Sequence, residues 1–382
     1  MPSTKFHRAF SLICLSSQVY ALVKVPFSTS LVPKLSKRST NTDTEDCIDC
    51  SSAPTINAGL KAVVSVEAGD FQTFSNVEID TGSALFWVGA GQKYIPGPHA
   101  YSLNQTFSEG YGDGYANGTV YADRVTIGNA TVDSQIIGAA QYIEGFQLSM
   151  PFDGLLGLGP NGSNTNQISG YDTTPTFVQS LAAEGTIEDA IFGIYISPVA
   201  ENGTRGVGEI TFGGVDESRF IGEIDWVPQI EPYNLHWSFN ASYFGWGNEY
   251  VIDSPIYAFT DTGGPLLEIP SDPYIWLLQN VPGITTDSTS LIQGGLIFPS
   301  NMTDTLPPLY IGVGSLNFTL SPSQYTVAKA LYSELNITDD GQIHTWIATA
   351  GPDEYDLGWP FLQQAYSAYD MVNNRVGFAH LA

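Results

Sequence analysis

The feature that most constrains the fold is a strand-and-turn pattern that occurs twice, once in each half of the chain. Residues 77–83 read Val-Glu-Ile-Asp-Thr-Gly-Ser, and residues 257–264 read Tyr-Ala-Phe-Thr-Asp-Thr-Gly-Gly. Each copy is followed, well downstream, by a short segment that ends in glycine, at residues 155–157 and 356–358. A duplication of this kind predicts two equivalent lobes whose aspartates lie beside a pseudo-twofold axis.

The composition of the chain favours strands and tight turns over helices. Glycine (39) and proline (23) are abundant, and Val, Ile, Thr, Tyr and Phe are frequent. Residues 124–138 read as a hairpin with its turn at Gly128. Helix signals are few: one at residues 176–184 and one at 271–278, with Ser271 as the cap. We therefore expect an all-β fold in two β-barrel-like lobes with minor helices.

The charge balance excludes several classes of partner. The sequence has 39 acidic and 13 basic residues and a formal net charge of −26. Such a negative field repels the phosphates of nucleic acids and anionic membrane surfaces. No apolar run approaches the length of a membrane span. We expect neither nucleic acid nor membrane among the partners.

The N-terminus has the features of a secreted, extracellular protein. Residues 1–21 read as a signal peptide, with a basic start, a short apolar stretch and small residues at the end. Residues 22–38 form a short pro-segment that ends in the dibasic pair Lys37-Arg38, and residues 39–57 form a loose arm. The alternatives are a frayed or mitochondrial N-terminus and an ordinary exposed basic pair. Secretion and processing are the favoured interpretations.

Sequons and cysteines agree with that compartment. The chain after the pro-segment has nine N-x-S/T sequons, which fits a secreted glycoprotein. They lie at Asn104, Asn117, Asn129, Asn161, Asn202, Asn240, Asn301, Asn317 and Asn336. Cys14 falls in the signal peptide, and Cys47 and Cys50 form a C-x-x-C. In a secreted chain this pair favours a small local disulfide over half a zinc site or a redox motif.

Two carboxylates can carry the chemistry. Asp80 and Asp261 each follow an apolar strand and precede a Thr-Gly turn, where glycine lets the backbone approach closely. If the two turns meet, the two carboxyl groups lie so close together that both cannot ionise easily. Their pKa values therefore split. One carboxylate then acts as a base on a water, and the other donates a proton to a substrate carbonyl. This pair would hydrolyse an amide without a covalent intermediate, a cofactor or a metal.

These residues and three further motifs resemble the pepsin family of aspartic proteases, and among them the secreted fungal enzymes of the polyporopepsin type. The first active-site loop is matched by residues 79–88 and the flap, a hairpin over the substrate, by residues 111–114. The strand behind the first aspartate is matched by residues 152–159, and the C-terminal strand by residues 374–379. The resemblance covers roughly residues 58–382.

The resemblance implies an aspartic-type endopeptidase, made as a zymogen, with a bilobal pepsin-like fold. The N-terminal lobe would span residues 58–220 and the C-terminal lobe residues 221–382. A long cleft between the lobes would bind an extended polypeptide. A monomer and inhibition by pepstatin-like compounds are also implied.

The resemblance further implies roles around the dyad. Asp80 and Asp261 would hold the catalytic water, the two threonines would cross-bond beneath them, and Trp87 would steady the flap tyrosine. Dyad support falls to Thr81, Gly82, Ser83, Thr262 and Gly263, and the flap and substrate contacts fall to Tyr111, Gly112, Asp113 and Trp87. As alternatives, the tyrosine belongs to an ordinary strand, the tryptophan to the core, and the flap aspartate to a turn rather than to a pocket for basic side chains.

The chain departs from the family pattern in three places. Gly264-Pro265 stand where the family has two hydroxyl residues, so the partner that would mirror Ser83 is missing. We expect a less symmetric dyad with a pH optimum nearer neutrality. Trp359-Pro360 replace the usual Asp and the residue after it, and the pro-segment is short. These departures keep open a second class of function, a secreted, weakly active or inactive binding protein that retains the cleft.

Overall fold

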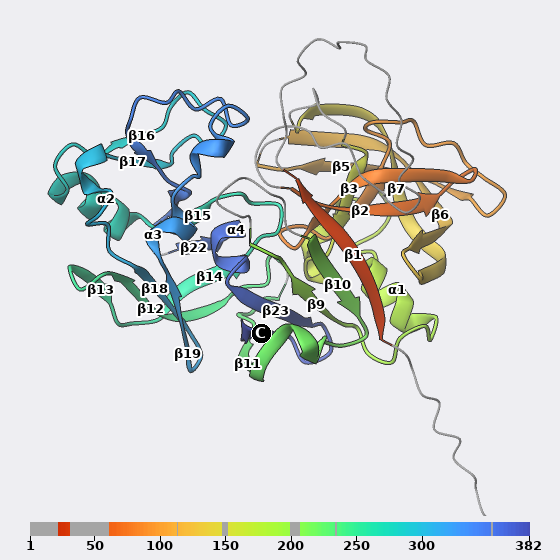
Figure 1. Cartoon of the computed structure of the whole chain (residues 1–382). Helices are drawn as coiled ribbons and strands as arrows, with labels where there is room; N and C mark the ends of the chain where they lie inside the picture. Colours follow the sequence, from red (N-terminus) through yellow and green to blue (C-terminus); the bar gives the residue numbers. More distant parts are fainter. Residues whose placement is uncertain are drawn as a thin grey trace, which may run out of the picture.

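The computed structural model describes residues 22–30, 61–112, 114–146, 152–198, 207–233, 235–352 and 354–382. The predicted signal peptide, the arm at residues 39–57, and the sites at Lys37-Arg38, Cys47, Cys50, Asp113 and Asn202 lie outside these ranges. Two lobes of strands lie on either side of the middle of the molecule (Figure 1).

Strands dominate both lobes, which confirms the predicted all-β class. The first half contains β1 (Val23–Ser30), β2 (Lys61–Ala68), β3 (Gln72–Asp80), β4 (Phe86–Val88), β5 (Tyr101–Gly110), β6 (Gly114–Ile127), β7 (Ala130–Gly145), β8 (Gly154–Gly157), β9 (Ile191–Tyr195) and β10 (Val207–Phe212). The second half contains β11 (Phe220–Pro228), β12 (Phe239–Trp246), β13 (Tyr250–Ile252), β14 (Ile256–Thr260), β15 (Leu267–Pro270), β16 (Thr285–Thr286), β17 (Leu296–Phe298), β18 (Leu309–Val313), β19 (Leu316–Leu320), β20 (Ile343–His344), β21 (Ile347–Gly351), β22 (Glu354–Leu357), β23 (Ala365–Asp370) and β24 (Arg375–Leu381).

Helices are short and few. The α-helices are α1 (Phe177–Ala183), α2 (Ser271–Asn280), α3 (Pro322–Tyr325) and α4 (Trp359–Leu362), and the 3-10 turns are η1 (Asn161–Asn164), η2 (Glu217–Arg219), η3 (Ser300–Met302) and η4 (Lys329–Leu331). Within the described ranges, none of them is long and apolar enough to cross a membrane.

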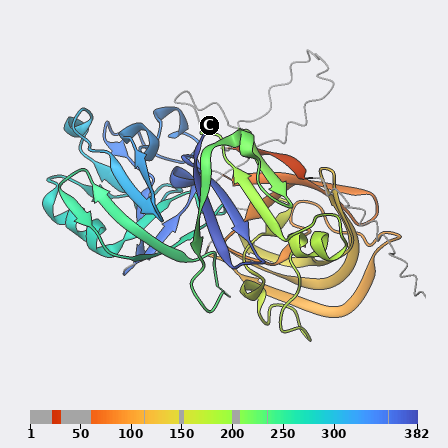
Figure 2. The same ribbon diagram turned by 90° about the horizontal axis from the view of Figure 1, so that it is seen from below.

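Three sheets organise these strands. The largest has the order β11-β24-β23-β9-β10-β1-β2-β3-β8-β4-β7-β6-β5, so its first three strands come from the C-terminal half. The second sheet has the order β19-β18-β12-β14-β22-β15-β21, and β16, β17 and β20 form a small third sheet. Figure 2 shows the last strands of the chain in the middle of the molecule, between the two lobes. The large sheet therefore links the lobes beneath the site described below.

The sequence repeat corresponds to a repeated strand arrangement. β3 pairs in parallel with β8, which places Asp80 opposite Gly157. β14 pairs in parallel with β22, which places Thr260, the residue before Asp261, opposite Leu357. β4 and β15 then pair antiparallel with β8 and β22. Each aspartate thus leaves the end of a central strand in the same local topology.

Local signals in the sequence are mostly confirmed. The predicted hairpin is present as β6 and β7, and Gly128 takes a positive φ of 60° in its turn. Thr176 forms a capping box at the start of α1, at the predicted position. The prediction that Ser271 caps the second helix is wrong, because α2 begins at Ser271 itself and Pro270 precedes it. The Ser271 hydroxyl instead lies 3.2 Å from that of Thr349 on β21.

Part of the predicted pro-segment forms β1, an inner strand of the large sheet. β1 pairs antiparallel with β10 from Val23 to Ser28 and with β2 from Ser28 to Ser30. The buried side chains of Val23 and Val25 join the main apolar core. Lys24 lies on the other face and forms an ion pair with Asp216 at 2.5 Å. This segment is therefore packed into the sheet along both of its edges.

Candidate active site

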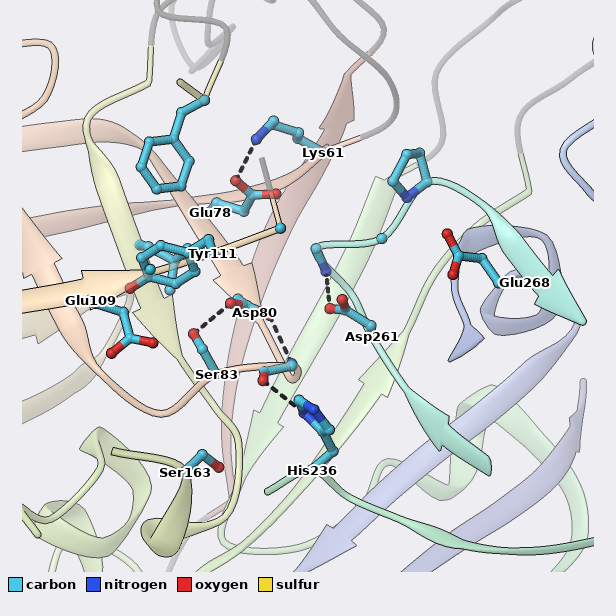
Figure 3. Close-up of a pocket in the computed structure, with 18 of the residues that line it drawn as sticks. Lys61, Glu78, Asp80, Ser83, Glu109, Tyr111, Ser163, His236, Asp261 and Glu268 are labelled. Atoms are coloured by element: carbon cyan, nitrogen blue, oxygen red, sulfur yellow. Dashed lines mark hydrogen bonds and ion pairs between the residues drawn. The ribbon is translucent and has the colours of Figure 1, made fainter. Parts of the chain in front are cut away.

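The two aspartates of the repeat meet at the middle of the molecule. Asp80 is the last residue of β3, and Asp261 directly follows β14. A Cβ added to Gly82 would lie 2.8 Å from the Asp261 carboxyl carbon, and one added to Gly263 would lie 3.2 Å from Asp80 Oδ1. The glycine of each loop therefore lies against the aspartate of the other loop, and Figure 3 shows the side chains of Asp80 and Asp261 beside each other. Such an approach requires a residue without a side chain at Gly82.

The two threonines interlock the loops from beneath. The backbone N–H of Thr81 donates to Thr262 Oγ1, and that of Thr262 donates to Thr81 Oγ1, both at 3.0 Å. The Thr81 hydroxyl donates to the carbonyl of Thr260 at 3.0 Å, and the Thr262 hydroxyl donates to that of Ile79 at 2.8 Å. Both threonines are fully buried, so this reciprocal network fixes the separation of the carboxyls.

The donors to the two carboxyls are only partly symmetric. Gly82 N–H donates to Asp80 Oδ1 at 2.7 Å, and Gly263 N–H donates to Asp261 Oδ1 at 2.8 Å. Ser83 Oγ adds a second donor to Asp80 at 2.5 Å. This asymmetry was expected, because the position of the second loop that corresponds to Ser83 is Gly264.

The pKa of Asp261 lies well above its usual range. Burial is the largest cause, and the negative charges of Asp80 and Asp356 add to it, while the Gly263 N–H opposes the shift. We expected a raised value because a hydroxyl is missing beside Asp261. The structure attributes it first to burial. A raised pKa favours the protonated form of Asp261.

A group of carboxyls that the sequence analysis overlooked lies behind Asp261. Asp356 faces Glu268 across the β15–β22 pair, and its Oδ1 is buried without a hydrogen-bond partner in the described part of the chain. Burial raises the pKa of Asp356 well above its usual range, and the nearby charges of Glu268 and Glu354 raise it further. In the first copy of the repeat the equivalent residue is Leu155. A comparison of the two copies could have revealed this difference.

Trp359, where the chain departs from the family pattern, supports the second loop. Its indole is fully buried, and Nε1 donates to the carbonyl of Thr262 at 3.0 Å. Its backbone N–H donates to the carbonyl of Gly264 at 3.1 Å. The second loop is therefore held from behind by an aromatic side chain in place of an acidic one.

The flap tyrosine is held by the predicted tryptophan. Trp87 Nε1 donates to the Tyr111 hydroxyl at 2.8 Å. Trp87 is buried in an aromatic cluster with Phe107, Phe146 and Phe152, at ring distances of 5.6 to 6.4 Å. Tyr111 in turn packs on Phe146, and its half-buried ring lies beside the dyad (Figure 3). This cluster holds Tyr111 in place, and Gly112 beside it lines the cleft.

A cleft of about 570 Å³ opens over the dyad. It contains the predicted residues Asp80, Gly82, Ser83, Tyr111, Gly112, Asp261 and Gly263, whereas Thr81, Thr262 and Trp87 lie behind its wall. It also contains residues that sequence reasoning missed, among them Lys61, Glu78, Glu109, Ser163, Leu235, His236, Glu268 and Leu291. Two of these had a usable signal, because Glu78 and Glu109 stand two residues before Asp80 and Tyr111, and alternate residues of a strand share a face.

Among the described residues that line the cleft, a lysine and a glutamate form an ion pair, and a histidine ring is held by a hydrogen bond and a stacking contact. Lys61 Nζ lies 2.7 Å from a carboxylate oxygen of Glu78, and both side chains are largely buried. His236 Nδ1 donates to the carbonyl of Gly82 at 3.0 Å, and its ring stacks on Phe259 at 4.5 Å. No group of three His, Cys, Asp or Glu residues suited to a metal ion occurs among the described residues.

Comparisons with known proteins agree with this arrangement. The sequence model of the family described as eukaryotic aspartyl protease matches residues 63–381. Polyporopepsin of Irpex lacteus is 28% identical over 338 residues, covering 86% of this chain and 96% of the relative. Gastricsin of Homo sapiens is 30% identical over 327 residues, covering 80% and 78%.

A solved structure supports the same conclusion. The crystal structure of the aspartic proteinase from Irpex lacteus superposes with a TM-score of 0.78 at 25% identity, covering 95% of this chain and 98% of that one. The predicted bilobal, pepsin-like fold is thereby confirmed. The chain belongs to the eukaryotic aspartyl protease family and is an aspartic-type endopeptidase.

Proposed function

We propose that the protein is a secreted, monomeric endopeptidase that cleaves extended polypeptides at acidic pH by activating a water between Asp80 and Asp261. The observation that carries this proposal is the interlocked pair of loops, in which Thr81 and Thr262 exchange hydrogen bonds at 3.0 Å beneath the carboxyls. Membership of the aspartyl protease family supports polypeptides as the substrate class. The signal-like N-terminus supports secretion.

In the proposed reaction, ionised Asp80 removes a proton from the water, and the water oxygen attacks the carbonyl carbon. Protonated Asp261 gives its proton to the carbonyl oxygen, which forms a neutral tetrahedral diol. The proton on Asp80 then passes to the amide nitrogen, the C–N bond breaks, and Asp261 recovers a proton from the diol. Both carboxyls return to their starting states. The raised pKa of Asp261 supports this division of roles.

The same division supports work at acidic pH. The active state needs a proton on Asp261, so activity is present below the pKa of Asp261 and is lost as the pH rises through it. The chain has only 13 basic residues, so it gains little net positive charge when its carboxyls are protonated. Self-repulsion in acid is therefore small.

The test is an assay of the purified secreted protein on a denatured protein substrate between about pH 3 and pH 7, with and without pepstatin. We expect pepstatin-sensitive cleavage in the acidic part of this range. Absence of cleavage by correctly processed, folded protein would contradict the proposal. It would support the alternative of a binding protein that retains the cleft. The reason for considering this alternative is Gly264-Pro265, which depart from the family pattern.

A further inference from the structure

The cleft over the dyad is strongly acidic. Its described lining has one lysine and one histidine, Lys61 and His236, and the lysine is already paired with a carboxylate at 2.7 Å. Against them stand five acidic residues, Glu78, Asp80, Glu109, Asp261 and Glu268. Figure 3 shows two of these, Glu109 and Glu268, on opposite sides of the catalytic pair. A substrate chain that lies across the dyad therefore passes, on each side, a carboxyl group that has no ion-pair partner among the described residues.

Glu109 is placed to meet a substrate side chain. It lies near the end of β5, two residues before Tyr111, and its half-buried side chain lines the cleft. Its carboxyl group accepts no hydrogen bond from any described residue and forms no ion pair with one. Burial and the negative charge of Asp80 together raise the pKa of Glu109 to about 8. A carboxyl group in such a position gains more from an arriving cation than an exposed, solvated one does.

We propose that Glu109 is a specificity-determining residue, which selects polypeptides with a lysine or arginine side chain at one position near the scissile bond. The inference rests on the proposed function, because it names the substrate feature that the cleft recognises. A lysine ammonium beside Glu109 replaces the missing donors to its carboxylate and offsets the neighbouring charge of Asp80. A neutral side chain of the same length does neither.

The preference for lysine depends on pH in a defined direction. The titratable groups that act on Glu109 are Asp80 on β3 and the nearby Tyr111, and Asp261 and His236 line the same cleft. In the empty cleft Glu109 is protonated below about pH 8, and a bound ammonium displaces that proton. Binding of a lysine side chain is thus linked to proton release, and it strengthens by up to about tenfold per pH unit as the pH rises toward 8.

The experiment compares kcat/KM for pairs of internally quenched peptides that carry lysine or norleucine at each position flanking the cleaved bond. The enzyme is the full secreted protein, and the ratio between the members of a pair cancels the titration of the dyad. At one position we expect the unaltered enzyme to prefer lysine by about tenfold near pH 6, with a larger ratio there than at pH 4. In E109Q the ratio at that position falls to about one and no longer changes with pH.

The matched control is E268Q, which removes the same carboxyl charge on the other side of the dyad. We expect E268Q to keep the lysine preference at the position that E109Q loses. E109K is a second variant, and it should gain a new preference, for glutamate over lysine at the same position. A reversal of this kind cannot result from poor folding.

Two outcomes would overturn the inference. One is a lysine ratio that E109Q leaves unchanged; if D113N then removes the preference, the selection belongs to Asp113. The other is an equal loss in E109Q and E268Q, which indicates a general field effect. If the unaltered enzyme cleaves none of the peptides or denatured proteins, the proposed function itself fails, and the inference fails with it.

Discussion

The two aspartate loops share a backbone design but differ in what surrounds it. Both have a glycine N–H that donates to the carboxyl and a threonine bonded to the other loop. The first loop adds a hydroxyl from Ser83, and the strand behind it contributes Leu155. The second loop has Gly264 at the hydroxyl position, and Asp356 stands behind it. The two loops thus share the hydrogen-bonded frame of the pair, while the side chains around each loop differ.

The strongest test of the two loops asks whether both carboxyls are needed for the same reaction. We expect D80N and D261N each to lower kcat by about 10³-fold, because each removes either the base or the acid of the same reaction. Peptide hydrolysis measures the effect, and pepstatin binding and circular dichroism establish that the variants are folded. Near-normal turnover in either variant would contradict a shared dyad.

Removal of the hydroxyl from the first loop makes the two loops more alike. We expect S83A to lower kcat by about tenfold, because the Ser83 hydroxyl donates to Asp80 at 2.5 Å and hydrogen bonds to charged groups are strong. The control is S163A, since Ser163 lines the same cleft but donates to the carbonyl of Pro160 at 2.7 Å. Equal effects of the two variants would show that the bond to Asp80 has no special role.

The acidic residue behind the second loop can be changed to the residue of the first. We expect D356L to raise the free energy of unfolding by about 1 to 2 kcal/mol, because Asp356 has a buried carboxyl oxygen without a partner. Urea unfolding at neutral pH measures the change. The reverse substitution, L155D, is the matched control and should destabilise the protein. A loss of stability in D356L would indicate that Asp356 has a partner when the protein is in solution.

The smallest effect is expected from restoring the missing hydroxyl. A Cβ at Gly264 would lie 3.4 Å from Asp261 Oδ2, an ordinary contact distance, so serine fits. In G264S the new donor favours the ionised form of Asp261 and lowers its pKa. Since activity requires the protonated form, the loss of kcat on the neutral side should move to lower pH by up to about one unit. A pH–rate profile identical to that of the unaltered enzyme would argue against a role for the missing hydroxyl.

The sequence predicts the centre of this site better than its walls. Each aspartate is contiguous in the chain with its own Thr-Gly neighbours. One short sequence pattern therefore indicates both which residues form the centre of the site and how their loop is shaped. Glu109, His236 and Glu268 come from separate strands and loops, and only the folded topology brings them into the same cleft.

The same distinction applies to the secondary structure. The helix predicted at residues 176–184 is present as α1, and the capping box with which it begins at Thr176 joins residues only three apart. The signal for α2 is misplaced by one residue, because the helix begins at Ser271 itself, and the Ser271 hydroxyl lies 3.2 Å from that of Thr349 on another strand. Interactions within a few residues can be read from the chain, whereas those between strands depend on a register that the sequence leaves open.

The position of β1 within the large sheet affects what a cut at Lys37-Arg38 would release. A cut there, as the sequence predicts, would remove the covalent link but leave Val23–Ser30 hydrogen-bonded between β10 and β2. In thermodynamic terms the freed peptide would be a ligand of the sheet, and it would stabilise the protein according to its own concentration and dissociation constant. Its departure would expose two strand edges, and such edges invite another strand. If the chain is cut at this site, maturation would therefore involve an exchange equilibrium as well as a cleavage.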